Sequence, residues 1–228
     1  MNKVSLMLVF LLLGLSVVAQ DQLIINGKTN IKADIKVYLF KWGEVKPVKI
    51  DSTKVKDGSF RFQKKSQLPG VFFLTFGKSR MPLVLFPEKD SLMVRVQISV
   101  GNGNIVSYNI LGSATQLAYN SYNHERKKLY QDYSLLGVSY SSATEKSNHK
   151  EIIRLDNEMK ILERKMNDLE IKTIDNNLSN LLSAFLVVNN RDKFNYPELK
   201  KKMDNMSTTL QNTVLYTFLQ KHLLKIKR

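Results

Sequence analysis

The stretch that decides the fold is residues 105–122, IVSYNILGSATQLAYNSY, because the spacing of its apolar residues changes partway along. Up to Leu111 the pattern is that of a β-strand, and after Gly112-Ser113 apolar side chains recur at helical spacing. Ser113 is expected to cap the helix that follows. The sequence therefore predicts an α+β protein, with an N-terminal antiparallel β-sandwich or open barrel followed by a C-terminal helical domain.

Upstream of this switch, residues 22–111 contain short β-branched and aromatic runs separated by turn residues. Asp57-Gly58 separates two such runs and predicts a tight hairpin, since both residues tolerate a positive φ. Gly101-Asn102-Gly103-Asn104 is expected to turn the chain into the last strand. Trp42 is expected near another hairpin tip, with its indole folded back onto the sandwich edge.

Downstream of the switch, the spacing predicts four helices. Residues 137–147 carry glycine and many serines and are expected to form a loop after the first helix. The second helix has a heptad seam made of Ile152, Leu155, Met159, Leu162, Met166 and Leu169. Fewer than three full heptads favour packing inside one chain, and a homodimer through the seam is the alternative. Residues 178–188 form the third expected helix, and Pro197 opens the fourth.

The N-terminus has the pattern of a secretory signal peptide. A basic start at Lys3 precedes the apolar run of residues 4–18, and we expect cleavage after Ala19. A retained membrane anchor is the alternative, but the run is shorter than the roughly 20 apolar residues that a spanning helix needs. The expected organisation is a signal peptide at 1–19, a β domain at 20–112 and a helical domain at 113–228, exported to a bacterial periplasm or secreted.

Composition limits the chemistry that the chain can perform. It has no cysteine, which excludes disulfides, thiolate nucleophiles, zinc ribbons and iron–sulfur clusters. The 35 basic and 20 acidic residues leave a formal charge of +15, but the charge is spread along the chain instead of being focused with stacking aromatics. We therefore expect no nucleic-acid partner. Solvated faces account for the basic clusters at residues 64–65, 126–128 and 200–202, and weak attraction to an anionic envelope surface is a further hypothesis.

The residues that could carry a reaction do not form a known motif. The histidines His124, His149 and His222 have no ligand spacing, and no Gly-x-Ser-x-Gly elbow is present. The carboxylates at expected strand ends are interpreted as turn formers or edge charges, namely Asp51, Asp57, Glu88 and Asp90. The sequence predicts no catalytic residue, no bound cofactor and no metal ligand.

The order of several motifs resembles a known family. It resembles the domain of unknown function, with its helical extension, at the N-terminus of exported thioredoxin-like redoxin proteins of Bacteroidetes. The motifs are Ile25-Asn26-Gly27, Val37-Tyr38-Leu39, Asp51-Ser52-Thr53, Val55 through Phe62, and Leu111-Gly112-Ser113. In typical members a redoxin domain with a Cys-x-x-Cys pair follows, whereas this chain has no cysteine. The resemblance therefore transfers no redox activity.

Two tripeptides also resemble the acceptor pattern for O-glycosylation in that phylum. They are Asp51-Ser52-Thr53 and Asp90-Ser91-Leu92, which make Ser52 and Ser91 the candidate modified residues. Use in a turn or at the start of a strand is the alternative for both.

The first functional hypothesis is a non-catalytic, exported protein that binds a protein or cell-envelope partner. The second is the accessory or truncated half of a periplasmic thiol–disulfide system, which docks a separate thioredoxin-like protein. An enzyme of unrecognised type is the third.

Overall fold

The computed structural model describes residues 21–30, 34–66, 68–77, 79, 82–88, 93–101 and 104–227. The expected signal peptide with its cleavage site after Ala19, and the candidates Asp90 and Ser91, lie outside these residues. The described part is α+β, with strands up to Leu111 and helices from Ala114 onward, as the sequence predicts. The division into separate β and helical domains stays a prediction.

The β-strands form two sheets. The first contains, in this order, β4 (Ser59–Ser66), β1 (Asp21–Thr29), β7 (Met93–Gly101) and β8 (Asn104–Leu111). The second contains β3 (Pro47–Lys54), β2 (Lys36–Trp42), β5 (Phe72–Phe76) and β6 (Leu83–Leu85). Inward-facing side chains of both sheets share one buried core, which makes the fold a sandwich.

One pairing departs from the expected antiparallel arrangement, because β1 and β7 run parallel. Between these two strands the chain crosses into the second sheet and back, so no tight hairpin fixes their relative direction. The expected turn into the last strand agrees with the antiparallel pairing of β7 with β8, in which Gly101 opposes Asn104, while residues 102 and 103 lie outside the described residues.

The Asp57-Gly58 turn forms, but the strands on either side of it do not pair as a hairpin. Asp57 and Gly58 have φ values of 48° and 72°, and the flanking Lys56 and Ser59 exchange backbone hydrogen bonds of 2.8 and 2.9 Å. However, β3 pairs with β2 and β4 pairs with β1. Val55 is fully buried in the sandwich core, so the chain passes there from one sheet to the other.

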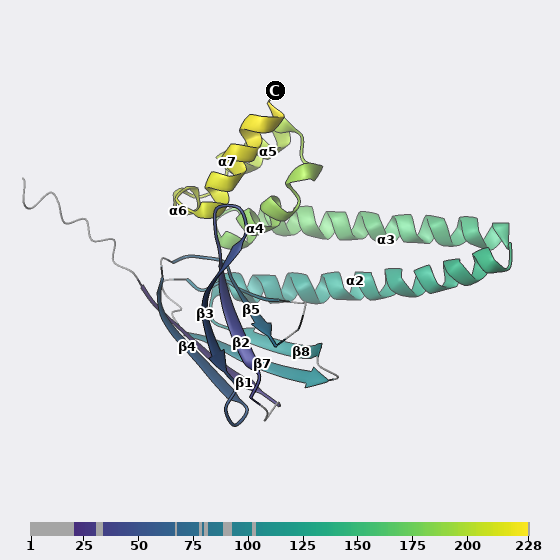
Figure 1. The fold of residues 1–228 in the computed structure, drawn as a ribbon. Coiled ribbons are helices and arrows are strands. Elements are labelled where there is room, and N and C mark those ends of the chain that lie inside the picture. The colour runs from purple at the N-terminus through teal and green to yellow at the C-terminus, as the bar shows by residue number, and fades with distance from the viewer. Residues whose placement is uncertain are drawn as a thin grey trace, which may run out of the picture.

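A long antiparallel helical hairpin follows the sheets and extends away from the sandwich (Figure 1). It consists of α2 (Ala114–Glu145) and α3 (His149–Asn176). The Ser113 hydroxyl caps α2 by accepting a hydrogen bond from the Gln116 backbone N–H at 3.0 Å, as predicted. The heptad seam of α3 lies along α2 of the same chain, and Leu155 is 1% exposed there.

The prediction of a loop at residues 137–147 is wrong, since α2 continues to Glu145. Its hydroxyl side chains bond back to backbone carbonyls one turn earlier, with Ser139 donating to Leu135 at 3.2 Å and Thr144 to Tyr140 at 2.9 Å. Serine and threonine are compatible with a helix when their hydroxyls are satisfied in this way. Packing along α3 therefore outweighs the weak local preference for a loop.

The remaining helices cover the base of the hairpin and one face of the second sheet (Figure 1). They are α4 (Leu181–Asn189), the short 3-10 helix η1 (Arg191–Lys193), α5 (Tyr196–Asp204), α6 (Thr208–Gln211) and α7 (Val214–Ile226). Residues 181–188 are all buried. Pro197 does open a helix, within a capping box formed by Asn195 and Glu198. Where the sequence predicts a single C-terminal helix, the structure has three, which share one buried core with α4.

A buried polar junction joins the sheets to the helices. The Phe86 backbone N–H donates to Gln116 Oε1 at 2.9 Å, and its carbonyl accepts a 2.5 Å hydrogen bond from the Ser113 hydroxyl. Asn120 Nδ2 donates to the Ile110 carbonyl at 2.7 Å. These bonds satisfy backbone groups of strand-flanking residues that would otherwise be buried without partners. They fix the start of α2 on the sandwich.

Candidate functional site

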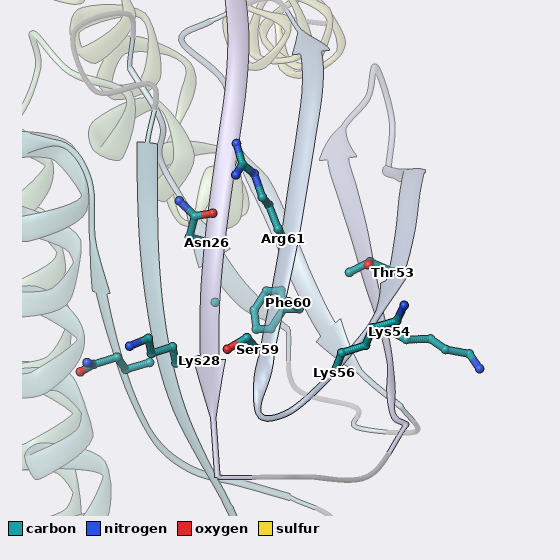
Figure 2. A pocket seen from close by; sticks show the side chains of 10 residues that line it. Asn26, Lys28, Thr53, Lys54, Lys56, Ser59, Phe60 and Arg61 are labelled. Carbon is teal, nitrogen blue, oxygen red and sulfur yellow. The ribbon is translucent and has the colours of Figure 1, made fainter.

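A cleft with a volume of about 830 Å³ lies where the edge strands β3 and β4 of the two sheets adjoin (Figure 2). Side chains from the first sheet and from β3 with its following turn line the cleft. Its lining residues are Asn26, Gly27, Lys28, Thr53, Lys54, Lys56, Ser59, Phe60, Arg61 and Gln97. We call this the sheet-edge cleft.

The sheet-edge cleft is cationic. Among the described residues that line it, Lys28, Lys54, Lys56 and Arg61 are basic and none is acidic. Lys54 forms an ion pair of 3.2 Å with Asp34, a residue outside the lining whose side chain is 71% exposed. This one carboxylate offsets one of the four cations, so the lining keeps a net positive charge that attracts anions.

The floor of the cleft is an aromatic ring packed on a glycine. Phe60 is 5% exposed, and its ring lies 5.3 Å from that of Phe76. A Cβ built on Gly27 would fall only 1.8 Å from the Phe60 ring. Glycine is therefore the residue that lets β1 approach the ring, and the floor is close-packed.

A second candidate surface is an apolar groove on the outside of the helical hairpin. It has a volume of about 400 Å³ and is lined by Asp132, Leu135, Leu136, Glu158, Ile161, Leu162 and Lys165. Leu135 on α2 is 68% exposed and Ile161 on α3 is 44% exposed. We call this the hairpin groove. Further exposed apolar side chains on the same two helices include Leu117, Tyr130, Val138, Ile153 and Ile171.

A third cavity of about 540 Å³ lies at the base of the hairpin, between α3 and α5. Its lining residue Glu170 accepts hydrogen bonds from Tyr122 Oη at 3.1 Å, Asn190 Nδ2 at 2.6 Å and Lys193 Nζ at 2.9 Å. Burial raises the pKa of the Tyr122 hydroxyl well above its usual range, and the Glu170 charge adds to this effect. The carboxylate is fully engaged in joining three helices, so we assign it a structural role.

The structure keeps the three histidines apart. His124 and His149 are exposed on α2 and α3, whereas His222 on α7 lies 3.9 Å from Asp192. Within the described residues, no group of three or more histidine and carboxylate side chains is placed to hold a metal ion.

The carboxylates singled out from the sequence are likewise dispersed. Asp51 lies 3.7 Å from Lys64, and Glu88 accepts a hydrogen bond from the Thr115 hydroxyl. Asp57 occupies its turn. The glycosylation candidate Ser52 is exposed on β3, and its backbone N–H donates to Asp51 Oδ1 at 2.8 Å.

Trp42 and Lys202 are more buried than an exposed loop or a solvated face would be, whereas Lys200 and Lys201 of the same basic cluster are exposed, as expected. The Trp42 ring lies 5.9 Å from Phe73 and 6.2 Å from Phe185, so the indole folds back as predicted, although it packs against α4. The Lys202 side chain is 14% exposed and forms an ion pair of 2.6 Å with Asp175. This lysine is therefore part of the packing between α3 and α5.

Comparison with protein families finds a similarity for the N-terminal part. Residues 23–119 match the family model described as "Domain of unknown function (DUF4369)". The match runs from β1 through all the strands of both sheets into the first turns of α2. The match supports a domain of unknown function in the N-terminal part of the chain. Comparisons with curated proteins and with solved structures returned no significant match.

The cations of the sheet-edge cleft are the feature that sequence reasoning missed. Lys28, Lys54, Lys56 and Arg61 come from two strands of one sheet, one strand of the other and the turn after it. No local motif connects them. The available signal is the scarcity of carboxylates in the strands of the first sheet, whose sequences contain only Asp21.

Proposed function

We propose that the protein is an exported, non-catalytic binding protein whose helical hairpin holds a protein partner in the bacterial cell envelope. The hairpin groove carries this proposal. Clustered exposed apolar side chains rimmed by polar residues can mark a protein-binding site, and here Leu135, Leu136, Ile161 and Leu162 line one groove.

The shape and charge of the groove favour a protein partner. Its apolar floor lies between α2 and α3, which suits an apolar helix face or an anchoring side chain. Its rim carries both signs of charge, Asp132 and Glu158 against Lys165, and such a rim favours orientation of a partner over attraction to a uniformly charged polymer.

Export is the second part of the proposal, to the periplasm or out of the cell. The basic start and apolar run of residues 1–19 support it. Within the described ranges, no helix combines the length and the apolar character needed to cross a membrane.

The test replaces groove residues with acidic ones. Leu135→Glu and Ile161→Glu place a charge in the proposed interface, and a buried unpaired charge is costly, so each should reduce partner recovery at least tenfold. A tagged chain is exposed to periplasmic extract, and captured proteins are quantified by mass spectrometry.

The export part of the proposal predicts cleavage after Ala19. N-terminal sequencing of the exported protein should therefore give Gln20 as its first residue.

Val138→Glu is the matched control, since Val138 is 71% exposed on α2 and does not line the groove. This variant should recover the partner as well as the wild type does. Equal recovery by both groove variants and the wild type would contradict the proposal, as would equal loss in all three variants.

A thioredoxin-like partner is the alternative occupant, which makes the chain an accessory half of a thiol–disulfide system. The DUF4369 match supports it, given the resemblance of the motifs to the redoxin-linked domain of Bacteroidetes. The same capture experiment distinguishes a thioredoxin-like partner from another protein. Recovery of a groove-dependent partner that has no redoxin domain would exclude the thioredoxin-like alternative. A homodimer through the helices of residues 152–169 stays a prediction, and self-capture of an untagged copy would support it.

A further inference from the structure

The outer face of the first sheet continues the sheet-edge cleft as an ordered polar surface. Lys28 pairs in register with Ser59 on β4 and with Gln97 on β7. Gln97 in turn pairs with Asn109 on β8. All four side chains are exposed, so hydroxyl, ammonium and amide groups form one row across the sheet, with neighbouring strands about 4.8 Å apart.

A second row lies beside the first. Asn26 pairs in register with Arg61, two residues along the strands from Lys28 and Ser59. Arg61 Nη2 donates to Gln63 Oε1 at 3.3 Å, so an amide holds its guanidinium on this face. Cations thus alternate with amides and hydroxyls, which can both donate and accept hydrogen bonds.

The charge of this surface has one sign. Among the described side chains that line the cleft from this sheet, Lys28 and Arg61 are cationic and none is acidic. Lys54 and Lys56 add two more cations across the cleft (Figure 2). These cations favour a ligand that carries several anionic groups.

The uncharged polar side chains on this surface indicate which kind of anionic ligand it suits. Amide and hydroxyl side chains on the same surface suit a ligand that presents many hydroxyls between its anionic groups. Single-stranded nucleic acid is held by aromatic side chains that stack on its bases, whereas the one ring that lines the cleft, Phe60, is 5% exposed. The surface therefore favours sugars over bases.

We propose that the sheet-edge cleft and the adjoining sheet face bind an acidic polysaccharide. Lys28, Lys54, Lys56 and Arg61 contact its carboxylate or sulfate groups, and Asn26, Gln97 and Ser59 contact its hydroxyls. This binding site is separate from the proposed protein interface on the hairpin. Either proposal can be refuted by its own test without affecting the other.

The test uses residues 20–228, the chain expected after signal cleavage. Its binding to polygalacturonate, dextran sulfate and neutral dextran is measured by affinity electrophoresis and calorimetry. Both acidic polymers or one of them should bind, and the comparison identifies carboxylate or sulfate as the preferred group. Lys28→Gln combined with Arg61→Gln should weaken binding at least tenfold and make it less sensitive to salt.

The matched control is Lys127→Gln combined with Lys128→Gln, which removes the same charge from exposed positions on α2. This variant should change the affinity less than twofold. Equal weakening by both double variants would overturn the proposal, because binding would then follow net charge alone.

A second comparison separates sugars from other polyanions. Gln97→Ala should weaken polysaccharide binding severalfold and leave residual binding to single-stranded DNA unchanged. Binding to DNA or to phosphatidylglycerol vesicles that is tighter than binding to either acidic polysaccharide would overturn the proposal, as would equal binding to neutral dextran.

Discussion

Replacing Phe86 with alanine should lower the free energy of unfolding by about 3–5 kcal/mol, the usual cost of removing a buried aromatic side chain. Phe86 is 1% exposed, and its ring lies 5.1 Å from Tyr119 and 5.3 Å from Phe185. Its backbone also bonds to Ser113 and Gln116. The ring therefore fills the space between the second sheet, α2 and α4.

Urea unfolding followed by circular dichroism and by tryptophan fluorescence measures this loss. The single tryptophan, Trp42, packs against Phe73 and Phe185 and so reports on the core around α4. Leu111→Ala is the control, because Leu111 is 44% exposed close to the same junction; it should cost less than about 1 kcal/mol. A Phe86→Ala loss below that of Leu111→Ala would contradict the assignment of Phe86 to this core.

Replacing Gly27 with alanine should destabilise the protein by about 3 kcal/mol, at the upper end of the range for overpacking. The new Cβ would meet the Phe60 ring at 1.8 to 2.4 Å. That ring is itself confined by Phe62 at 6.2 Å and Phe76 at 5.3 Å, so it cannot move aside without disturbing the sandwich core.

The double variant Gly27→Ala with Phe60→Leu tests this cause. Leucine vacates the space that the ring occupies, so the double variant should be more stable than the sum of the two single effects allows. Strict additivity in thermal or urea unfolding would contradict steric contact as the reason for glycine at this position.

The class of fold could be predicted because it depends on local signals. The change of period at Ser113, the side-chain cap there and the positive φ values at Asp57 and Gly58 are all encoded within a few residues. The sequence of Pro197 and the capping residues around it likewise marks the start of α5.

The errors arise where distant contacts override local preference. Residues 137–145 have the composition of a loop, but packing along α3 keeps them helical. The turn at Asp57-Gly58 has the sequence of a hairpin, but burial of Val55 sends β3 and β4 into different sheets. Neither outcome can be derived from a window of neighbouring residues.

The two candidate surfaces could be predicted from the sequence to different degrees. The heptad seam indicates that α3 packs along another helix, yet it does not reveal the groove left between Leu135 and Ile161 on the outside of the hairpin. The cations of the sheet-edge cleft are separated in sequence and meet only through the strand order of the two sheets. Their total charge was visible in the composition, but their clustering required the fold.

Site-specific crosslinking tests the central claim, partner binding in the hairpin groove, most directly. The chain has no cysteine, so Leu135→Cys carries a single thiol that can be labelled with a photoreactive maleimide; Ser52→Cys, exposed on β3, is the control. The account predicts one discrete adduct with a periplasmic protein from position 135 and none from position 52. The same adduct from both positions, or no adduct from position 135, would contradict it.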